Sequence, residues 1–280
     1  MTRVLIDGRI AGHDGIGRYT TCLVRALRAQ AGPGVTIDVL PPTGTPRYSR
    51  AEGTELLEAA RACQADIVHL LDYRVPLEPA TVPLVVTIHL PVLHVPTEDR
   101  KPVDGRYLLY VGQARAHKGM GILVDAYQRS HAAQARIRLV CVDRDFADKA
   151  PMSASIRNVL GNAAVMFGSV GDSTLCALYR HAEFLVHLAE HEGFGFTPLE
   201  ALAAGTRVLT SDIPVLRETL ADHALFTDPT DVAAIAKAIN RLIATPDKPT
   251  SRRRRMSWAG RYRWSRHADD VLAIYREIAS

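Results

Sequence analysis

Short apolar runs alternate with longer stretches of helical periodicity along most of the 280 residues. The runs are continuously apolar, which is typical of strands buried on both faces of a parallel sheet. Their alternation with helical stretches predicts βαβ units and an α/β fold. We expect strands at Val4–Asp7, Val35–Leu40, Asp66–Leu70, Leu84–His89, Tyr107–Gly112, Ile137–Val142, Ala164–Phe167, Phe184–His187 and Arg207–Thr210. We expect helices at Gly17–Ala29, Thr54–Cys63, Gly119–His131, Ser173–His181 and Thr197–Gly205.

A proline-rich segment divides the chain. Residues 89–106 contain Pro91, Pro96 and Pro102 among several charges, a composition that disfavours both helix and central strand. We therefore expect an N-terminal domain of residues 1–103 and a larger one of residues 104–264. Residues 265–280 carry apolar side chains at helical spacing and predict a C-terminal helix that docks on the rest of the protein.

The formal charge of +4 is too small to indicate a nucleic-acid partner. Much of it lies in the run Arg252–Arg255, which we interpret as a solvated helix face. A patch for anionic lipid, and so a peripheral membrane contact, is the alternative interpretation of this run.

The cysteines stand far apart, without a CxxC pair, and are typical of buried thiols in a reducing compartment. The N-terminus leads directly into a strand-like run and lacks the apolar core of a signal peptide. No apolar stretch approaches the length of a membrane-spanning helix. We therefore expect a cytoplasmic protein.

Residues 186–220 carry the strongest chemical signal. A strand ends near His187, a glycine-containing turn runs from Glu192 to Gly195, and Pro198 stands where a helix should begin. Free backbone N–H groups at such a helix start form a site for an anion such as a diphosphate. Glu200 follows inside the helix, so the two glutamates are placed to reach different parts of one ligand, the sugar and the ribose.

This segment resembles the signature of the retaining glycosyltransferases of family 4, in which two glutamates are separated by seven residues within EGFGxxxxEAxAxG. The matching residues are Glu192, Gly193, Phe194, Gly195, Glu200, Ala201, Ala203 and Gly205. The stretches 15–20, 110–119, 169–187 and 263–275 also resemble family segments. The resemblance implies the GT-B fold, in which two Rossmann-like domains face each other across a cleft. It also implies metal-independent hexosyl transfer with retention, with a nucleoside-diphosphate sugar such as a UDP-sugar as donor and no cofactor.

The resemblance also assigns roles to single residues. Lys118 matches the lysine that grips the donor diphosphate, and Arg115 assists it, because Gln113 stands where the family usually carries an arginine. Glu192 matches the glutamate near the transferring sugar, and Glu200 the one that binds the ribose.

Backbone groups and the first domain complete the site that the resemblance implies. Phe194, Gly195 and Phe196 are expected to offer N–H groups to the donor. Gly15 and Gly17 let the first-domain loop approach the diphosphate closely. His89 matches a histidine that faces the sugar.

Other motifs suggest weaker alternatives. Asp143 and Asp145 follow a strand with the DxD spacing of a metal site, but such pairs are common by chance. His187 and His191 stand near Glu192 without sharing one helix face, so zinc is disfavoured. The glycines of residues 12–17 do not have dinucleotide-binding spacing.

The first domain is short compared with the family, because residues 89–106 replace several expected elements. A homodimer contact or the C-terminal helix is expected to cover its apolar surface. A nucleotide-sugar-binding partner or regulator that has lost turnover is therefore the rival interpretation, and a hydrolase or phosphorolysing relative is a weaker one. The acceptor stays open.

Overall fold

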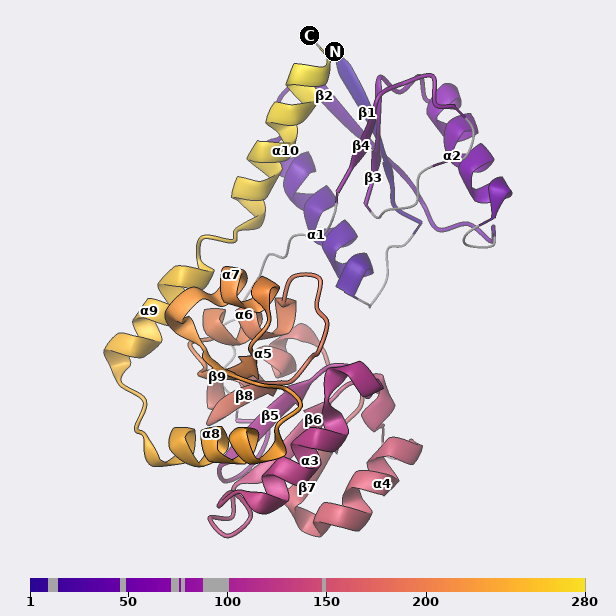
Figure 1. The fold of residues 1–280 in the computed structure, drawn as a ribbon. Helices are drawn as coiled ribbons and strands as arrows, with labels where there is room; N and C mark the ends of the chain where they lie inside the picture. The colour runs from indigo at the N-terminus through magenta and orange to yellow at the C-terminus, as the bar shows by residue number, and fades with distance from the viewer. Residues whose placement is uncertain are drawn as a thin grey trace. The chain divides into compact units, whose positions relative to one another are not determined.

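The computed structural model describes residues 1–9, 15–45, 49–71, 76, 79–87, 101–147 and 150–279. The chain forms two compact units, one of Met1–Leu93 with Tyr262–Ser280 and one of His94–Arg261. Each unit is built on one parallel sheet covered by helices (Figure 1). The predicted α/β fold class is thus confirmed. Among the helices described, none is long and apolar enough to cross a membrane.

The first unit has a four-stranded sheet in the order β2-β1-β3-β4, with every pairing parallel. Its elements are β1 (Thr2–Asp7), α1 (Gly15–Gln30), β2 (Val35–Leu40), α2 (Arg50–Ala62), β3 (Ile67–Leu70), β4 (Leu84–Val86) and the chain-terminal α10 (Trp264–Ile278). The ranges predicted for these strands agree with the structure to within about two residues, except that β4 ends at Val86.

Helices cover both faces of this sheet. Val4 and Ile6 of β1 point to the face on which α1 and α10 lie, whereas Leu5 between them packs with α2 on the other face. Figure 1 shows α10 alongside α1, with α2 across the sheet. The first part of the chain would by itself expose apolar surface on the α1 face of the sheet. Helix α10, from the other end of the chain, buries much of this surface.

A chain of buried polar groups fastens α10 to this unit. His69 of β3 is fully buried, with its Nδ1 atom hydrogen-bonded to the Tyr275 hydroxyl and its Nε2 atom 2.5 Å from Thr87 Oγ1. Tyr19 of α1 forms a second link, 2.8 Å from Nε2 of His267. Burial, aided by the neighbouring His267, lowers the pKa of His69 to about 3. His69 is therefore neutral, and it fixes where α10 docks.

The second unit has a six-stranded sheet in the order β10-β9-β8-β5-β6-β7, again all parallel. Its strands are β5 (Tyr107–Val111), β6 (Arg138–Val142), β7 (Ala164–Phe167), β8 (Phe184–His187), β9 (Val208–Ser211) and β10 (Leu225–Thr227). Its α-helices are α3 (Met120–Arg129), α4 (Pro151–Leu160), α5 (Asp172–His181), α6 (Phe196–Ala203), α7 (Pro214–Leu220), α8 (Val232–Ala244) and α9 (Pro249–Ala259). The edge strand β10 is too short and too mixed in composition for its pattern to have predicted it.

The two faces of this sheet bury alternate residues of each strand. Leu108 and Tyr110 of β5 belong to a core completed by α3, α4 and α8. Tyr107 lies on the other face, where its hydroxyl donates a 2.8 Å hydrogen bond to the Leu178 carbonyl at α5. Because helices cover both faces of the sheet, a ligand could reach it only at the ends of the strands.

The arginine run in α9 is not the uniformly solvated face that its sequence suggests. Arg252, Arg253 and Arg254 are exposed, but Arg255 is 6% exposed and donates to the Gly205 carbonyl from two nitrogens, at 2.7 and 3.1 Å. Arg255 thereby satisfies a carbonyl at the end of α6, which contacts α9. The cysteines are free thiols, of which Cys22 and Cys63 are half-buried rather than buried.

Candidate functional site

The second sheet has a topological switch point beside β5. From β5 the chain continues to β6 and β7 on one side, and later returns to build β8, β9 and β10 on the other. The segments that follow β5 and β8 therefore diverge, and the carboxyl ends of these strands border a crevice of the kind in which α/β proteins bind ligands. Lys118 lies in the segment after β5, and Glu192 in the segment after β8.

Close backbone contacts join these two segments. Gly119 has a φ of 72°, and a side chain there would bring a Cβ atom to 2.5 Å from the Leu188 carbonyl oxygen, so only glycine fits. The Glu190 N–H also donates a 2.9 Å hydrogen bond to the His117 carbonyl. The backbone around Lys118 is thus held against the backbone that leads to Glu192.

Lys118, His187 and Glu192 form the charged cluster of the site. Lys118 Nζ lies 2.8 Å from Glu192 Oε2, and His187 Nε2 lies 3.1 Å from the same oxygen. Burial by itself would raise the pKa of Glu192, but hydrogen bonds and charge from His187 and Lys118 outweigh it and lower the pKa to about 2. The Glu192 carboxylate is therefore ionised at neutral pH. Its two partners are the Lys118 ammonium group and the His187 imidazole.

The N-terminus of α6 completes this edge. Its first residue follows Gly195, which has a φ of 94° and whose Cβ, if present, would lie 2.4 Å from Leu216 Cδ2. Phe196 and Thr197 stand in the first helical turn, where backbone N–H groups have no acceptor within the helix. The Thr219 hydroxyl donates a 2.8 Å hydrogen bond to the carbonyl of Phe194 and orients the turn. The backbone N–H groups at the start of α6 are suited to bind an anion.

Two further predicted residues of this unit lie outside the charged cluster. Glu200, inside α6, accepts a 3.0 Å hydrogen bond from the buried Tyr179 of α5. Arg115 is exposed, and in the part of the chain that the structure describes its side chain forms no hydrogen bond or ion pair. Glu200 thus has a partner on a neighbouring helix, whereas Arg115 is exposed to solvent.

The remaining predicted site residues belong to the first unit. Gly15 and Gly17 lie in the first turn of α1. His89 lies outside the described residues.

The alternative metal ligands have structural partners. Asp145 Oδ2 accepts a 3.1 Å hydrogen bond from the Ala114 N–H, and Asp143 Oδ1 accepts one of 3.2 Å from the Asp145 N–H. Over the described residues there is no group of three or more His, Cys, Asp or Glu side chains that could hold a metal ion.

Sequence reasoning missed His187. It considered this histidine only as a zinc ligand and disfavoured that role, although a histidine that ends a strand five positions before the first signature glutamate can lie next to that carboxylate. Its side chain is 7% exposed, and Thr210 anchors its carbonyl with a 3.0 Å hydrogen bond.

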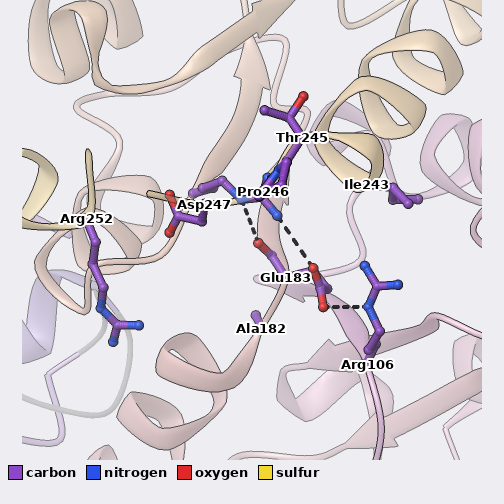
Figure 2. Close-up of a pocket in the computed structure, with 9 residues that line it drawn as sticks. Arg106, Ala182, Glu183, Ile243, Thr245, Pro246, Asp247 and Arg252 are labelled. Atoms are coloured by element: carbon purple, nitrogen blue, oxygen red, sulfur yellow. Dashed lines mark hydrogen bonds and ion pairs between the residues drawn. The ribbon is translucent and has the colours of Figure 1, made fainter. Parts of the chain in front are cut away.

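A polar pocket of about 380 Å³ lies at the opposite, amino-terminal edge of the same sheet (Figure 2). Arg106 Nε donates a 2.7 Å hydrogen bond to Glu183 in its wall. Arg207 donates to the carbonyls of Leu242 and Thr245, at 2.7 and 2.6 Å, and so satisfies the end of α8. These guanidinium groups already have protein partners. We therefore interpret them as groups that link neighbouring elements of the second unit, and not as a ligand site.

Two parallel α/β sheets, one of them with a cation and a helix N-terminus at its switch point, define a Rossmann-like protein of the GT-B type. The family model described as "Glycosyl transferases group 1" matches residues 96–263, more than half of the chain. The chain belongs to this family, and the predicted family 4 relationship is confirmed.

Similar proteins agree with this assignment. The phosphatidyl-myo-inositol mannosyltransferase of Mycobacterium tuberculosis is 30% identical over 196 residues, 65% of this chain and 50% of that protein. The GDP-mannose:cellobiosyl-diphosphopolyprenol alpha-mannosyltransferase of Xanthomonas campestris is 30% identical over 57% of this chain and 44% of that protein. The chain thus spans about half the length of the curated relatives it matches.

Among solved structures, sucrose-phosphate synthase from Thermosynechococcus elongatus is similar over the whole of both chains, with a TM-score of 0.73 and 18% sequence identity. A likeness at this identity concerns the fold alone. It agrees with the predicted GT-B architecture.

Proposed function

We propose that this protein transfers a hexose from a nucleoside-diphosphate sugar to an acceptor hydroxyl, with retention of the anomeric configuration and without a metal ion. The observation that carries the proposal is the 2.8 Å pair of Lys118 and Glu192, at a switch point that also holds the N-terminus of α6. A cation and unpaired N–H groups suit a diphosphate, and the adjacent carboxylate suits sugar hydroxyls.

The reaction requires stabilisation of charge on two sides of one bond. As the bond to the sugar breaks, negative charge grows on the departing phosphate, and Lys118, Arg115 and the N–H groups of Gly195 and Phe196 are the groups that would stabilise it. The sugar gains positive character, which the ionised Glu192 would stabilise.

Other residues are proposed to hold the ends of the donor. Glu200 would accept hydrogen bonds from the ribose hydroxyls, and Phe194 would contribute through its backbone. Gly15 and Gly17 would let the first unit approach the diphosphate, and His89 would face the sugar.

Retention fits a mechanism in which the leaving phosphate helps to remove the acceptor proton on the same face of the sugar. Neither Glu192 nor Glu200 needs to act as the nucleophile or acid of a glycoside hydrolase. The anomeric configuration of the product, read from the one-bond carbon–proton NMR coupling constant at C1, tests retention directly. An inverted product would contradict this mechanism.

GDP-mannose is the first donor to test, because the Xanthomonas relative is named for it. UDP-sugars follow, as the sequence resemblance implied. A thermal-shift panel of GDP-, UDP-, ADP- and TDP-sugars should identify the donor, and turnover should follow with phosphatidylinositol and polyprenyl-diphosphate saccharides, the acceptor types in the relatives' names. Binding without turnover on any acceptor would favour the nucleotide-sugar-binding partner instead.

Metal independence has its own test. Activity should persist in EDTA, because cations and backbone dipoles of the protein are proposed to meet the phosphate charge. Loss of activity in EDTA and its return with manganese would favour Asp143 and Asp145 as metal ligands instead.

A further inference from the structure

We infer that His187 is a positioning residue of the donor site, which retains the Glu192 carboxylate when Lys118 turns from it to the donor diphosphate. The inference rests on the proposed function, because it requires a diphosphate to compete for Lys118. It deepens that function by assigning a role to a strand histidine outside the family signature.

The competition follows from the geometry of one oxygen atom. Glu192 Oε2 lies 2.8 Å from Lys118 Nζ and 3.1 Å from His187 Nε2. A lysine that pairs with a carboxylate has less attraction left for a phosphate. A bound diphosphate would therefore compete with Glu192 for Lys118.

Loss of Lys118 would cost free energy if Glu192 had no second partner. Its side chain is only 16% exposed, so solvent replaces little of the lost ion pair. Its other carboxylate oxygen, Oε1, accepts one long hydrogen bond, 3.3 Å from the Gly193 N–H. A second partner on Oε2 lowers the cost of releasing Lys118.

His187 is built to be that partner. Its side chain is 7% exposed and its backbone is paired within the sheet, where Leu185 and Val186 of the same strand pair with β9. The imidazole can donate through Nε2–H to a carboxylate in its neutral form as well as in its protonated form. It therefore stays in place while the longer and more exposed Lys118 side chain, at 24% exposure, moves.

The test is calorimetric titration with GDP, UDP, ADP and TDP, which needs neither acceptor nor turnover. His187→Met replaces the imidazole, with its N–H group, by an apolar side chain of similar length. Nucleoside-diphosphate affinity should therefore fall about tenfold, the loss expected for one hydrogen bond to a charged group. His187→Gln can place an amide N–H near the Nε2 position and should stay within about threefold of wild type. His187→Asn is too short to reach Glu192 and should resemble the methionine variant.

A second substitution separates positioning from folding. Glu192→Gln removes the competing charge and should bind the nucleoside diphosphate at least as tightly as wild type. In the double variant His187→Met with Glu192→Gln, the loss caused by methionine should vanish, because no carboxylate is left to hold Lys118. A merely structural defect at His187 would persist in the double variant.

The outcomes are distinct. If wild type binds one of these nucleotides and His187→Met and His187→Asn bind it equally well, the inference is wrong and the proposed function stands. If the double variant keeps the full loss, His187 acts through the fold and the inference is wrong as well. If wild type binds none of the four nucleotides, the proposed function falls and this inference falls with it. Melting temperatures of each variant confirm that the compared proteins are folded.

Discussion

Each unit of the protein contains a buried strand histidine, and the two histidines differ in their partners. His69 in the first unit contacts the neutral hydroxyls of Thr87 and Tyr275 deep in the core. His187 in the second unit lies at the carboxyl end of β8, beside the charged Glu192. The first arrangement fastens a helix, and the second belongs to the site for which we propose a charged ligand. Depth in the sheet and the charge of the neighbour, rather than residue type, separate the two roles.

The largest expected effect is on the first arrangement. Tyr275→Ala removes a fully buried ring that packs between α10 and the sheet, and it should destabilise the first unit by about 3–5 kcal/mol, the range for truncating a buried aromatic side chain. Hydrogen exchange followed by mass spectrometry should show faster exchange in β1, β3 and α10, with β5 and β8 unchanged.

The matched control is Tyr275→Phe, which keeps the ring and removes the hydroxyl next to His69. It should cost about 1–2 kcal/mol, as expected when a buried polar atom loses one partner. Equal exchange rates in wild type and Tyr275→Ala would show that α10 contributes little to the first unit.

The next effect distinguishes the two units by the pH range in which each loses stability. Because the folded-state pKa of His69 is about 3, against about 6.5 in an unfolded chain, the unfolded state binds the additional proton as pH falls below 6.5. The first unit should therefore be most stable above pH 6.5 and lose stability progressively toward pH 3. The Glu192 pKa of about 2, against about 4.3 unfolded, makes the corresponding contribution in the second unit disappear only between about pH 4.3 and 2.

Thermal unfolding at pH 7, 5.5 and 4.5 checks this order, with exchange rates assigning each transition to a unit. His69→Gln should flatten the pH dependence of the first unit and leave that of the second as it is. A first unit whose stability is constant from pH 7 to 4.5 would contradict a neutral, buried His69.

Lys118→Ala sharpens the comparison from the other side. The side chain is partly exposed and serves the site, so its loss should weaken nucleoside-diphosphate binding by about 1–3 kcal/mol, the range for one charged hydrogen bond. The melting temperature should change little, in contrast with the Tyr275 variants. Unchanged affinity by calorimetry would remove Lys118 from the donor site.

The smallest effect concerns Glu200. If its carboxylate accepts both ribose hydroxyls, Glu200→Gln should weaken a ribonucleoside diphosphate by about 0.5–1.5 kcal/mol more than the 2′-deoxy analogue. Tyr179→Phe is the control, because it removes the hydroxyl that holds Glu200 and leaves the charge. Equal losses for the two nucleotides would make Glu200 a structural partner of Tyr179.

Much of the second unit could be predicted from local pattern. The runs Ala164–Phe167 and Phe184–His187 form β7 and β8 with the bounds expected, because strands buried on both faces are continuously apolar. The turn at Gly195 could also be predicted, because a helix that starts from a left-handed residue in a tight contact needs glycine there. Arg255 was misjudged, because a run of arginines carries no sign of which one meets a helix end.

The sequence by itself determined the α/β class, the positions of most strands along the chain, the family and the segment that carries Glu192 and Glu200, because these depend on periodicity and on motifs of neighbouring residues. Tertiary structure decided which distant residues meet. It brought Lys118, from the segment after β5, and His187, from the end of β8, to one carboxylate oxygen, and α10 to the face of β1 from the far end of the chain. The sequence had left either a second subunit or this helix to cover that face. The physical reason is that burial and ion pairing act through distance in space, and spacing along the chain does not encode that distance.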